Sequence, residues 1–195
     1  MQLYLIRHPA PQIAAGVCYG RSDLPLAEDV AVAAARILPQ LPPLLPPLLP
    51  LYTSPLQRCL QLANALHPAP HSDHRLQEMN FGVWELRPWQ LIEREALDGW
   101  AADPLGYCPP QGESVGQLQA RVHDFVMEAR RQGVQRAVLV THAGVMKVIV
   151  GHARGLPATQ WMALKFEHES VIEVDMPNPE TSHQGIPSSP KGTRT

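Results

Sequence analysis

Two short apolar segments, each followed directly by a histidine, constrain the fold more than any other feature of the sequence. Residues 2–7 (QLYLIR) precede His8, and residues 136–141 (RAVLVT) precede His142. Their nearly unbroken apolar character is typical of strands that are buried on both faces, as in a parallel sheet. Ligands gather at the carboxyl ends of such strands. If the two strands are neighbours, both imidazoles therefore share one cleft.

Helical patterns alternate with the apolar strand patterns along the chain. Ser54 suits the N-cap of a helix, and Pro55 suits its first position. Gln117 follows Ser114 at the spacing of a capping box. Strands that alternate with helices predict an α/β fold of three layers, α/β/α, with a mostly parallel central sheet. We expect helices over residues 28–38, from Ser54 to Leu66, near residues 88–98, from Ser114 onward and over residues 145–154, and further strands over residues 51–53 and 170–176.

Two segments of unusual composition mark the organisation of the chain. Residues 41–50 contain only Leu and Pro. This composition favours a connector with polyproline character over a motif that recognises a partner. Residues 178–195 are rich in Pro, Gly and polar residues, which predicts a disordered tail. A chain of 195 residues suits one domain, and we expect that domain to span residues 1–177.

Charge and cysteine usage exclude several classes of function. The net charge of −2 lacks the basic surplus of a nucleic-acid-binding protein. Three cysteines, an odd number, argue against a disulfide framework and for a reducing compartment. The apolar N-terminal stretch is too short for a signal peptide, and no apolar run reaches membrane-spanning length. These features favour a cytoplasmic protein that binds neither nucleic acid nor membrane, and they do not predict its oligomeric state.

Nine histidines raise the question of a metal site. His71 and His74 lie close together, but they are in a Pro-rich segment with no helix to fix their spacing, and HExxH is absent. Cys18, Cys59 and Cys108 form no CxxC pair. We therefore expect neither a metal ion nor another cofactor.

The residues near the two strand ends suit phosphoryl transfer. Arg7 precedes His8, and Arg58 lies in the first turn of a predicted helix, where free backbone N–H groups favour an anion. Guanidinium groups bind phosphoryl oxygens in a planar, bidentate way. A neutral His8 could attack phosphorus through one ring nitrogen, and nearby arginines lower the pKa of a histidine. A protonated His142 could donate to a phosphoryl oxygen.

The leaving alkoxide needs a proton, and two carboxyl groups compete to supply it. Glu78 lies between apolar residues in the segment LQEMNFG, so its partial burial beside a phosphate would favour the protonated acid. It could then deprotonate the attacking water in a second step. Glu85 lies close by in the sequence. Composition alone does not separate the two.

The sequence resembles the histidine phosphatase (phosphoglycerate mutase-like) superfamily, most closely its α-ribazole phosphatase-like branch. The resemblance implies that His8 is the phosphorylated histidine and that His142 is the second strand-end histidine of the family. It also implies that Arg7 and Arg58 bind phosphate, and it favours Glu78 as the proton donor. The matching segments, in the family order, are LYLIRHP, CYGRSDLPL, YTSPLQRC, LQEMNFGVWE, GESVGQLQARV and VLVTHAGVMK.

The resemblance further implies a small cap inserted at about residues 76–112 and hydrolysis of a small phosphomonoester without a metal ion. α-Ribazole 5′-phosphate is the best single prediction for the substrate. A phosphoglycerate mutase is the second hypothesis, although residues 76–112 offer only Arg87 and Arg94 for a substrate carboxylate. A non-catalytic module that binds phosphate esters or proteins is the third. Tyr19 and Arg21 are candidates for contact with the substrate.

Three departures from the family pattern concern the first motif and the cap. Pro9 replaces the usual glycine after the nucleophile, and Leu86 stands where related phosphatases tend to have glycine. The polar residues that often follow the first motif as extra phosphate ligands are missing, because Ala, Pro and Ile occupy positions 10, 11 and 13–15. These departures leave the predicted reaction class intact. They bear on the identity of the substrate and on the rate. We expect Lys147 to be solvated. The tryptophans at 84, 89 and 100 should pack the cap against the core, and the alternative is that one of them lines the substrate pocket.

Overall fold

A five-stranded sheet forms the centre of the protein in the computed structural model, which describes residues 1–42 and 49–177. The middle of the Leu-Pro segment and the predicted tail lie outside these residues. The pairs β3–β2, β2–β4 and β4–β1 are parallel, and only the pair β1–β5 is antiparallel among the described strands. The sheet is therefore mostly parallel, as predicted. The strand order is β3-β2-β4-β1-β5, where the strands are β1 (Gln2–Arg7), β2 (Leu51–Thr53), β3 (His71–Ser72), β4 (Arg136–Thr141) and β5 (Val171–Asp175).

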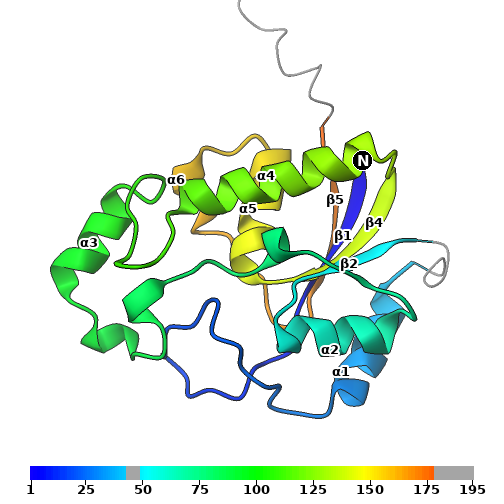
Figure 1. Ribbon diagram of the computed structural model, residues 1–195, viewed down its shortest axis with the longest axis horizontal. Coiled ribbons are helices and arrows are strands. Elements are labelled where there is room, and N and C mark those ends of the chain that lie inside the picture. Colours follow the sequence, from blue (N-terminus) through cyan, green and yellow to red (C-terminus); the bar gives the residue numbers. More distant parts are fainter. Residues whose placement is uncertain (43–48, 178–195) are drawn as a thin grey trace, which may run out of the picture.

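Helices cover both faces of this sheet, which confirms the three-layer fold (Figure 1). Helices α1 and α2 pack on one face, and α4 and α5 pack on the other. In Figure 1, α3 lies away from the sheet, at the far left. The α-helices of the described residues are α1 (Val30–Ile37), α2 (Gln57–Leu66), α3 (Arg94–Ala102), α4 (Val115–Arg131), α5 (Ala143–Ala153) and α6 (Ala158–Trp161). Short 3-10 helices span Leu38–Gln40, His74–Leu76, Gly82–Trp84 and Trp89–Leu91.

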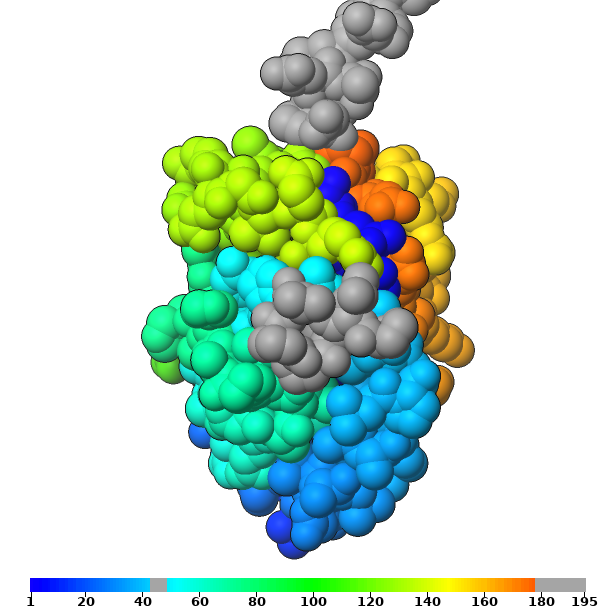
Figure 2. Space-filling model, turned by 90° about the vertical axis from the view of Figure 1, so that its right-hand side faces the viewer, coloured from blue at the N-terminus to red at the C-terminus, as the bar shows by residue number. Residues whose placement is uncertain are grey.

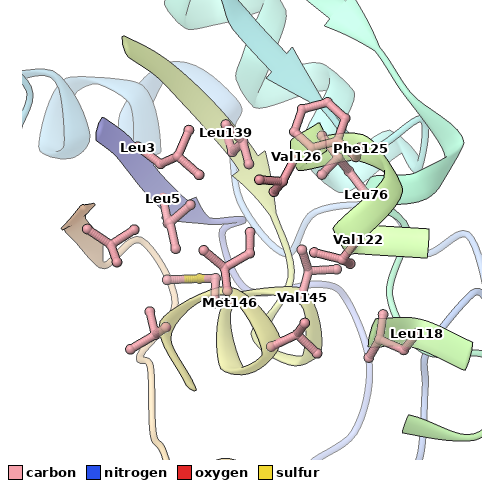
Figure 3. Close-up of a cluster of buried hydrophobic side chains, with 14 of the residues drawn as sticks. Leu3, Leu5, Leu76, Leu118, Val122, Phe125, Val126, Leu139, Val145 and Met146 are labelled. Carbon is pink, nitrogen blue, oxygen red and sulfur yellow. The ribbon is translucent and has the colours of Figure 1, made fainter. Parts of the chain in front are cut away.

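The side chains of β1 explain why its sequence is almost continuously apolar. Successive residues of a strand point to opposite faces of the sheet, and both faces are covered here. Leu3 and Leu5 belong to the core beneath α4 and α5, whereas Tyr4 and Ile6 belong to the core beneath α1 and α2. Figure 3 shows Leu5 pointing toward Met146 of α5. Full burial of each such side chain stabilises the fold by about 1.5–3 kcal/mol.

The start of α4 was predicted correctly, whereas the start of α2 was not. The capping box of α4 is present, because the side chains of Ser114 and Gln117 each accept from the backbone N–H of the other. The start of α2 at Ser54 and Pro55 was predicted wrongly, since the helix begins at Gln57. The Ser54 hydroxyl accepts from the N–H of the residue two positions later and closes a short turn instead. The helix expected near residues 88–98 is a 3-10 turn followed by α3.

The cap has a small apolar core of its own. Cys18, Trp84 and Ile92 are buried together there, apart from the two faces of the sheet. The segment at Cys18 is bound to the cap by backbone hydrogen bonds to Leu86 and Arg87. Burial raises the pKa of the Cys18 thiol to about 12. Cys18 therefore packs against the segment predicted to form the cap and does not line the cleft.

The two ends of the sheet differ in what surrounds them. Figure 2 shows the end where the parallel strands begin, with the dark-blue start of β1 between green α4 and the orange end of β5. Backbone hydrogen bonds join Gln2 to Gln135 and Met1 to Met176 there. The carboxyl ends of the strands lie at the other end of the sheet, beside the cap. Within the residues that the structure describes, no helix combines the length and the apolarity needed to cross a membrane.

Candidate active site

The structure brings the two strand-end histidines together. Strands β1 and β4 are parallel neighbours with Arg7 opposite Thr141, so the residues that follow them are adjacent. The backbone N–H of His8 donates to the carbonyl of Thr141 at 3.0 Å. The ring centroids of His8 and His142 are 4.9 Å apart. Both side chains are buried.

Hydrogen bonds fix the tautomer of His8. Its Nδ1 lies 2.6 Å from the Pro9 carbonyl oxygen, which can only accept, so Nδ1 carries the proton. The lone pair is then on Nε2, and the Arg58 Nε–H donates to it at 3.3 Å. Burial first, and then the charge of Arg58, hold the pKa of His8 well below its usual value. The imidazole is therefore neutral near pH 7, with its Nε2 lone pair available as a nucleophile.

Arg58 is fully buried beside His8. Its two terminal nitrogens donate to backbone carbonyls, Nη1 to Ser22 at 2.8 Å and Nη2 to Gly20 at 2.6 Å. A guanidinium group has five N–H donors, so one N–H on each terminal nitrogen is still free. The Arg58 guanidinium, which the sequence predicts to bind phosphate in a bidentate way, thus uses part of its N–H groups for the loop at residues 20–22. Arg58 does not line the neighbouring cavity in this conformation.

Arg7 differs from Arg58 because it lines a cavity of about 410 Å³ beside His8. Its Nη1 donates to the Phe166 carbonyl at 2.6 Å. Its Nε is buried and has no hydrogen-bond partner among the described residues. An unsatisfied buried donor costs about 1–3 kcal/mol, which an anion bound in the cavity would recover.

His142 is neutral in the ligand-free site. Burial first, and then the proximity of His8 and Arg58, hold its pKa well below the usual value. Its Nε2 is hydrogen-bonded to the Ser54 hydroxyl at 2.8 Å. The protonated form of His142, which could donate to a phosphoryl oxygen, is therefore not the resting form. A phosphate dianion beside it would favour protonation.

The structure separates Glu78 from Glu85. The Glu78 carboxylate lines the cavity and accepts from the backbone N–H of Gly144, in the first turn of α5, at 3.0 Å. Glu85 does not line the cavity. Its carboxylate accepts from the backbone N–H groups of Arg21, Ser22 and Phe81 instead and joins the cap to the loop at residues 20–22. Glu85 is a structural residue, and Glu78 is the carboxylate that faces the cleft.

The cavity contains some of the expected substrate contacts and lacks others. Tyr19 lines it, whereas Arg21 does not, because the Arg21 guanidinium pairs with Glu113. Lys147, which was predicted to be solvated, is half-buried, lines the cavity and donates to the Met162 carbonyl at 3.0 Å. Burial lowers the pKa of Lys147. Besides Tyr19, the aromatic lining contains Phe81, Trp89, Trp100 and Trp161, but not Trp84.

Sequence reasoning missed a third histidine at the site. The ring of His168 lies 5.4 Å from that of His8. Its Nε2 is 3.5 Å from the Tyr19 hydroxyl. His168 precedes β5, and because β5 is antiparallel, its start lies beside the carboxyl end of β1. The direction of β5 was the missing information, since a strand pattern does not reveal it.

Comparisons with known proteins reveal similar sequences and structures. The profile of the family described as histidine phosphatase superfamily (branch 1) matches residues 3–185. A protein of Hydrogenobacter thermophilus, provisionally named phosphoserine phosphatase 2, is 25% identical over 183 residues, which are 90% of this chain and 89% of the relative. The crystal structure of an α-ribazole phosphatase from Shigella flexneri covers 90% of each chain at 25% identity and a TM-score of 0.74. A phosphoglycerate mutase from Thermus thermophilus covers 91% of this chain and 94% of its own, at 29% identity and a TM-score of 0.71.

Proposed function

Because this chain belongs to the histidine phosphatase superfamily, we propose that it hydrolyses small phosphomonoesters through a phosphohistidine on His8. One observation carries the proposal. A neutral His8, with Nδ1–H held by the Pro9 carbonyl, lies at a cavity that is lined by the cation of Arg7 and the carboxyl group of Glu78. These are the nucleophile, the anion ligand and the proton donor that the reaction needs.

In the first step, His8 Nε2 attacks phosphorus and the bond from phosphorus to the leaving oxygen breaks. Glu78 gives its proton to that oxygen as the alcohol leaves. Once phosphorus is bonded to His8 Nε2, this nitrogen no longer accepts the hydrogen bond from Arg58. The Arg58 Nε–H can then donate to a phosphoryl oxygen. Arg7 binds the same group through the Nε that has no partner among the described residues. Charge on the transferring phosphoryl group is neutralised by both arginines.

In the second step, a water molecule attacks the phosphohistidine and the bond between phosphorus and Nε2 breaks. Glu78, now ionised, takes a proton from the water. The products are inorganic phosphate, neutral His8 and protonated Glu78, so these groups regain the protonation states with which the first step began. No step in this sequence requires a metal ion.

The cavity lining supports α-ribazole 5′-phosphate as the first substrate to test. Its leaving group contains a flat aromatic ring, and Phe81, Trp89 and Trp100 offer an aromatic surface in the cap. The centroids of Trp89 and Trp100 are 6.4 Å apart with nearly parallel planes. Aromatic contacts of this kind contribute about 0.5–1.5 kcal/mol beyond the burial of area.

Lys147 favours a mutase as the second candidate. A mutase needs cations for the carboxylate of phosphoglycerate, and neither Arg87 nor Arg94 lines the cavity. Arg87 donates to a backbone carbonyl, and Arg94 pairs with Asp98 at the surface. Lys147 is the cation that α5 contributes to the lining. We expect a mutase to have more than one cation for the substrate carboxylate. Hydrolysis therefore ranks first.

A phosphate-release screen tests the proposal. The purified protein is incubated with phenyl phosphate, α-ribazole 5′-phosphate, phosphoserine and 3-phosphoglycerate, the last also with a trace of bisphosphoglycerate. We expect phosphate release by the wild type and none above background by His8→Ala, with release retained by His74→Ala, whose histidine is exposed and outside the cavity. Interconversion of 3- and 2-phosphoglycerate without net release would identify a mutase. A protein that binds these esters but neither releases phosphate nor becomes phosphorylated would be a binding module.

A further inference from the structure

Side-chain donors are missing from the loop that follows the nucleophile. Residues 10–15 are APQIAA, and Gln12, which alone carries a side-chain donor there, is exposed and does not line the cavity. A phosphoryl group at His8 would therefore meet few donors on this side. The turn before β5 brings His168 to within 5.4 Å of His8, measured between ring centroids. We propose that His168 is a phosphate-binding residue of this site and supplies the donor that the first loop lacks; this inference rests on the proposed phosphatase function.

The turn at residues 166–170 is firmly attached to the strand that carries the nucleophile. The Arg7 N–H donates to the Ser170 carbonyl, and the Glu169 N–H donates to the Arg7 carbonyl. The Phe166 carbonyl accepts from the Arg7 guanidinium at 2.6 Å. Three hydrogen bonds thus join the turn to the residue before His8. The position of His168 relative to the nucleophile is therefore defined by backbone as well as by side chains.

The turn also contains a strained residue that an ion pair holds in place. Glu169 has a φ of +63°, the left-handed conformation that residues other than glycine seldom adopt. Its carboxylate accepts two hydrogen bonds from Arg36 of α1, each 2.6 Å long. Strained backbone persists where the surroundings enforce it, and it is concentrated at functional sites. Glu169 adjoins His168, whose ring lies 5.4 Å from that of His8.

The Tyr19 hydroxyl lies 3.5 Å from Nε2 of His168. In the proposed tautomer, this hydroxyl donates to Nε2 and the proton of the neutral imidazole is on Nδ1. Burial first, and then the charge of Arg7, lower the pKa of His168 to about 4. The ring is therefore neutral near pH 7 and does not compete with the arginines as a cation. In the proposal, its Nδ1–H donates to a phosphoryl oxygen of the group on His8.

The assignment makes a specific prediction about selectivity. A donor to the transferred phosphoryl group acts on every substrate alike, whereas a contact to the leaving group acts on some substrates and not on others. Loss of His168 should therefore weaken inorganic phosphate as an inhibitor and lower kcat/KM by the same factor for all phosphomonoesters. Removal of one donor to a charged group corresponds to a loss of about 10- to 100-fold.

The test compares His168→Leu, His168→Asn and the surface control His74→Leu. Asparagine keeps an N–H donor near the position of Nδ1, and leucine keeps the bulk without a donor. We expect the inhibition constant of phosphate to rise about 10- to 100-fold in His168→Leu. His168→Asn should recover most of this loss, and His74→Leu should match the wild type. Thermal melting of each variant confirms that it is folded, and calorimetric titration with phosphate replaces inhibition if His168→Leu is too slow to assay.

Two results would overturn the assignment. The first is an unchanged affinity of His168→Leu for phosphate. The second is a loss of kcat/KM for α-ribazole 5′-phosphate that phenyl phosphate does not share, because this would place His168 against the leaving group. Failure of the proposed function has a different signature, since the wild type would then release no phosphate from any ester. Direct titration with phosphate would still test His168 in that case.

Discussion

Replacing Gly144 by alanine should disable Glu78 while leaving the fold intact. A Cβ atom at position 144 would overlap Oε1 of Glu78 and come within 3.1 Å of its carboxyl carbon. The overlapped atom is the far end of a flexible side chain, so the carboxylate moves and the backbone stays. The next neighbour, Leu118, is in ordinary contact at 3.4 Å. The substitution therefore acts mainly on one hydrogen bond, from the Gly144 N–H to Glu78.

The cost to stability follows from opposing contributions. A hydrogen bond to a charged group contributes about 1.5–3 kcal/mol, and the half-buried carboxylate favours the lower end of this range. Alanine in a helix offsets part of the loss, by about 0.5–1 kcal/mol. The free energy of unfolding should thus fall by about 1 kcal/mol. The effect on catalysis should be much larger, because general acid catalysis contributes about 10²- to 10⁴-fold.

The leaving group distinguishes loss of the acid from general damage. Phosphorylation of His8 by an alkyl phosphate, followed by rapid quenching, should slow in Gly144→Ala about as much as in Glu78→Gln, and the double variant should be no slower. The burst of p-nitrophenol from p-nitrophenyl phosphate needs no proton donor and should persist in all three. An equal loss of both reactions in Gly144→Ala, or a melting temperature far below that of Glu78→Gln, would refute the reasoning.

Three further predictions concern stability and cofactors. His8 and His142 have lowered pKa values, so below about pH 6.5 the unfolded state binds more protons than the native state. As the pH is lowered, the free energy of unfolding should fall by up to about 1.4 kcal/mol per pH unit for each histidine. Denaturant titrations at several pH values should show a weaker dependence on pH for His8→Asn than for the wild type. An equal dependence would contradict the effect of burial on His8. Leu86 is exposed at a φ of +64°, so Leu86→Gly should raise the free energy of unfolding by about 1 kcal/mol, and a thermal shift in the opposite direction would show that the strain is absent. EDTA should leave phosphate release unchanged, whereas a loss restored by added metal would revive a metal-dependent mechanism.

Most of the central sheet was predictable, because burial on both faces leaves a strong pattern. The segments that became β1 and β4 are apolar at nearly every position, and each is followed by a histidine. Parallel pairing then placed His8 and His142 together. The short β3 was not predicted, since its two residues are exposed and polar and carry no pattern.

The remaining parts of the site depend on tertiary contacts that local sequence does not encode. Lys147 lines the cavity and donates to the carbonyl of Met162, which lies beyond the end of its helix. Arg58 is occupied by carbonyls of a loop more than thirty residues away. The Arg21 guanidinium pairs with Glu113, a partner that cannot be inferred from the sequence around Arg21. Each of these contacts forms between distant segments, so no window of sequence contains both partners.

The position of the phosphoryl group after one turnover tests the central claim most directly. The protein is mixed with ³²P-labelled phenyl phosphate, quenched in alkali within milliseconds, digested and mapped by mass spectrometry. We predict an acid-labile, alkali-stable phosphate on His8, absent from His8→Ala and present at wild-type yield in His74→Ala. Label on another residue, or phosphate release by His8→Ala at the wild-type rate, would contradict the proposed mechanism.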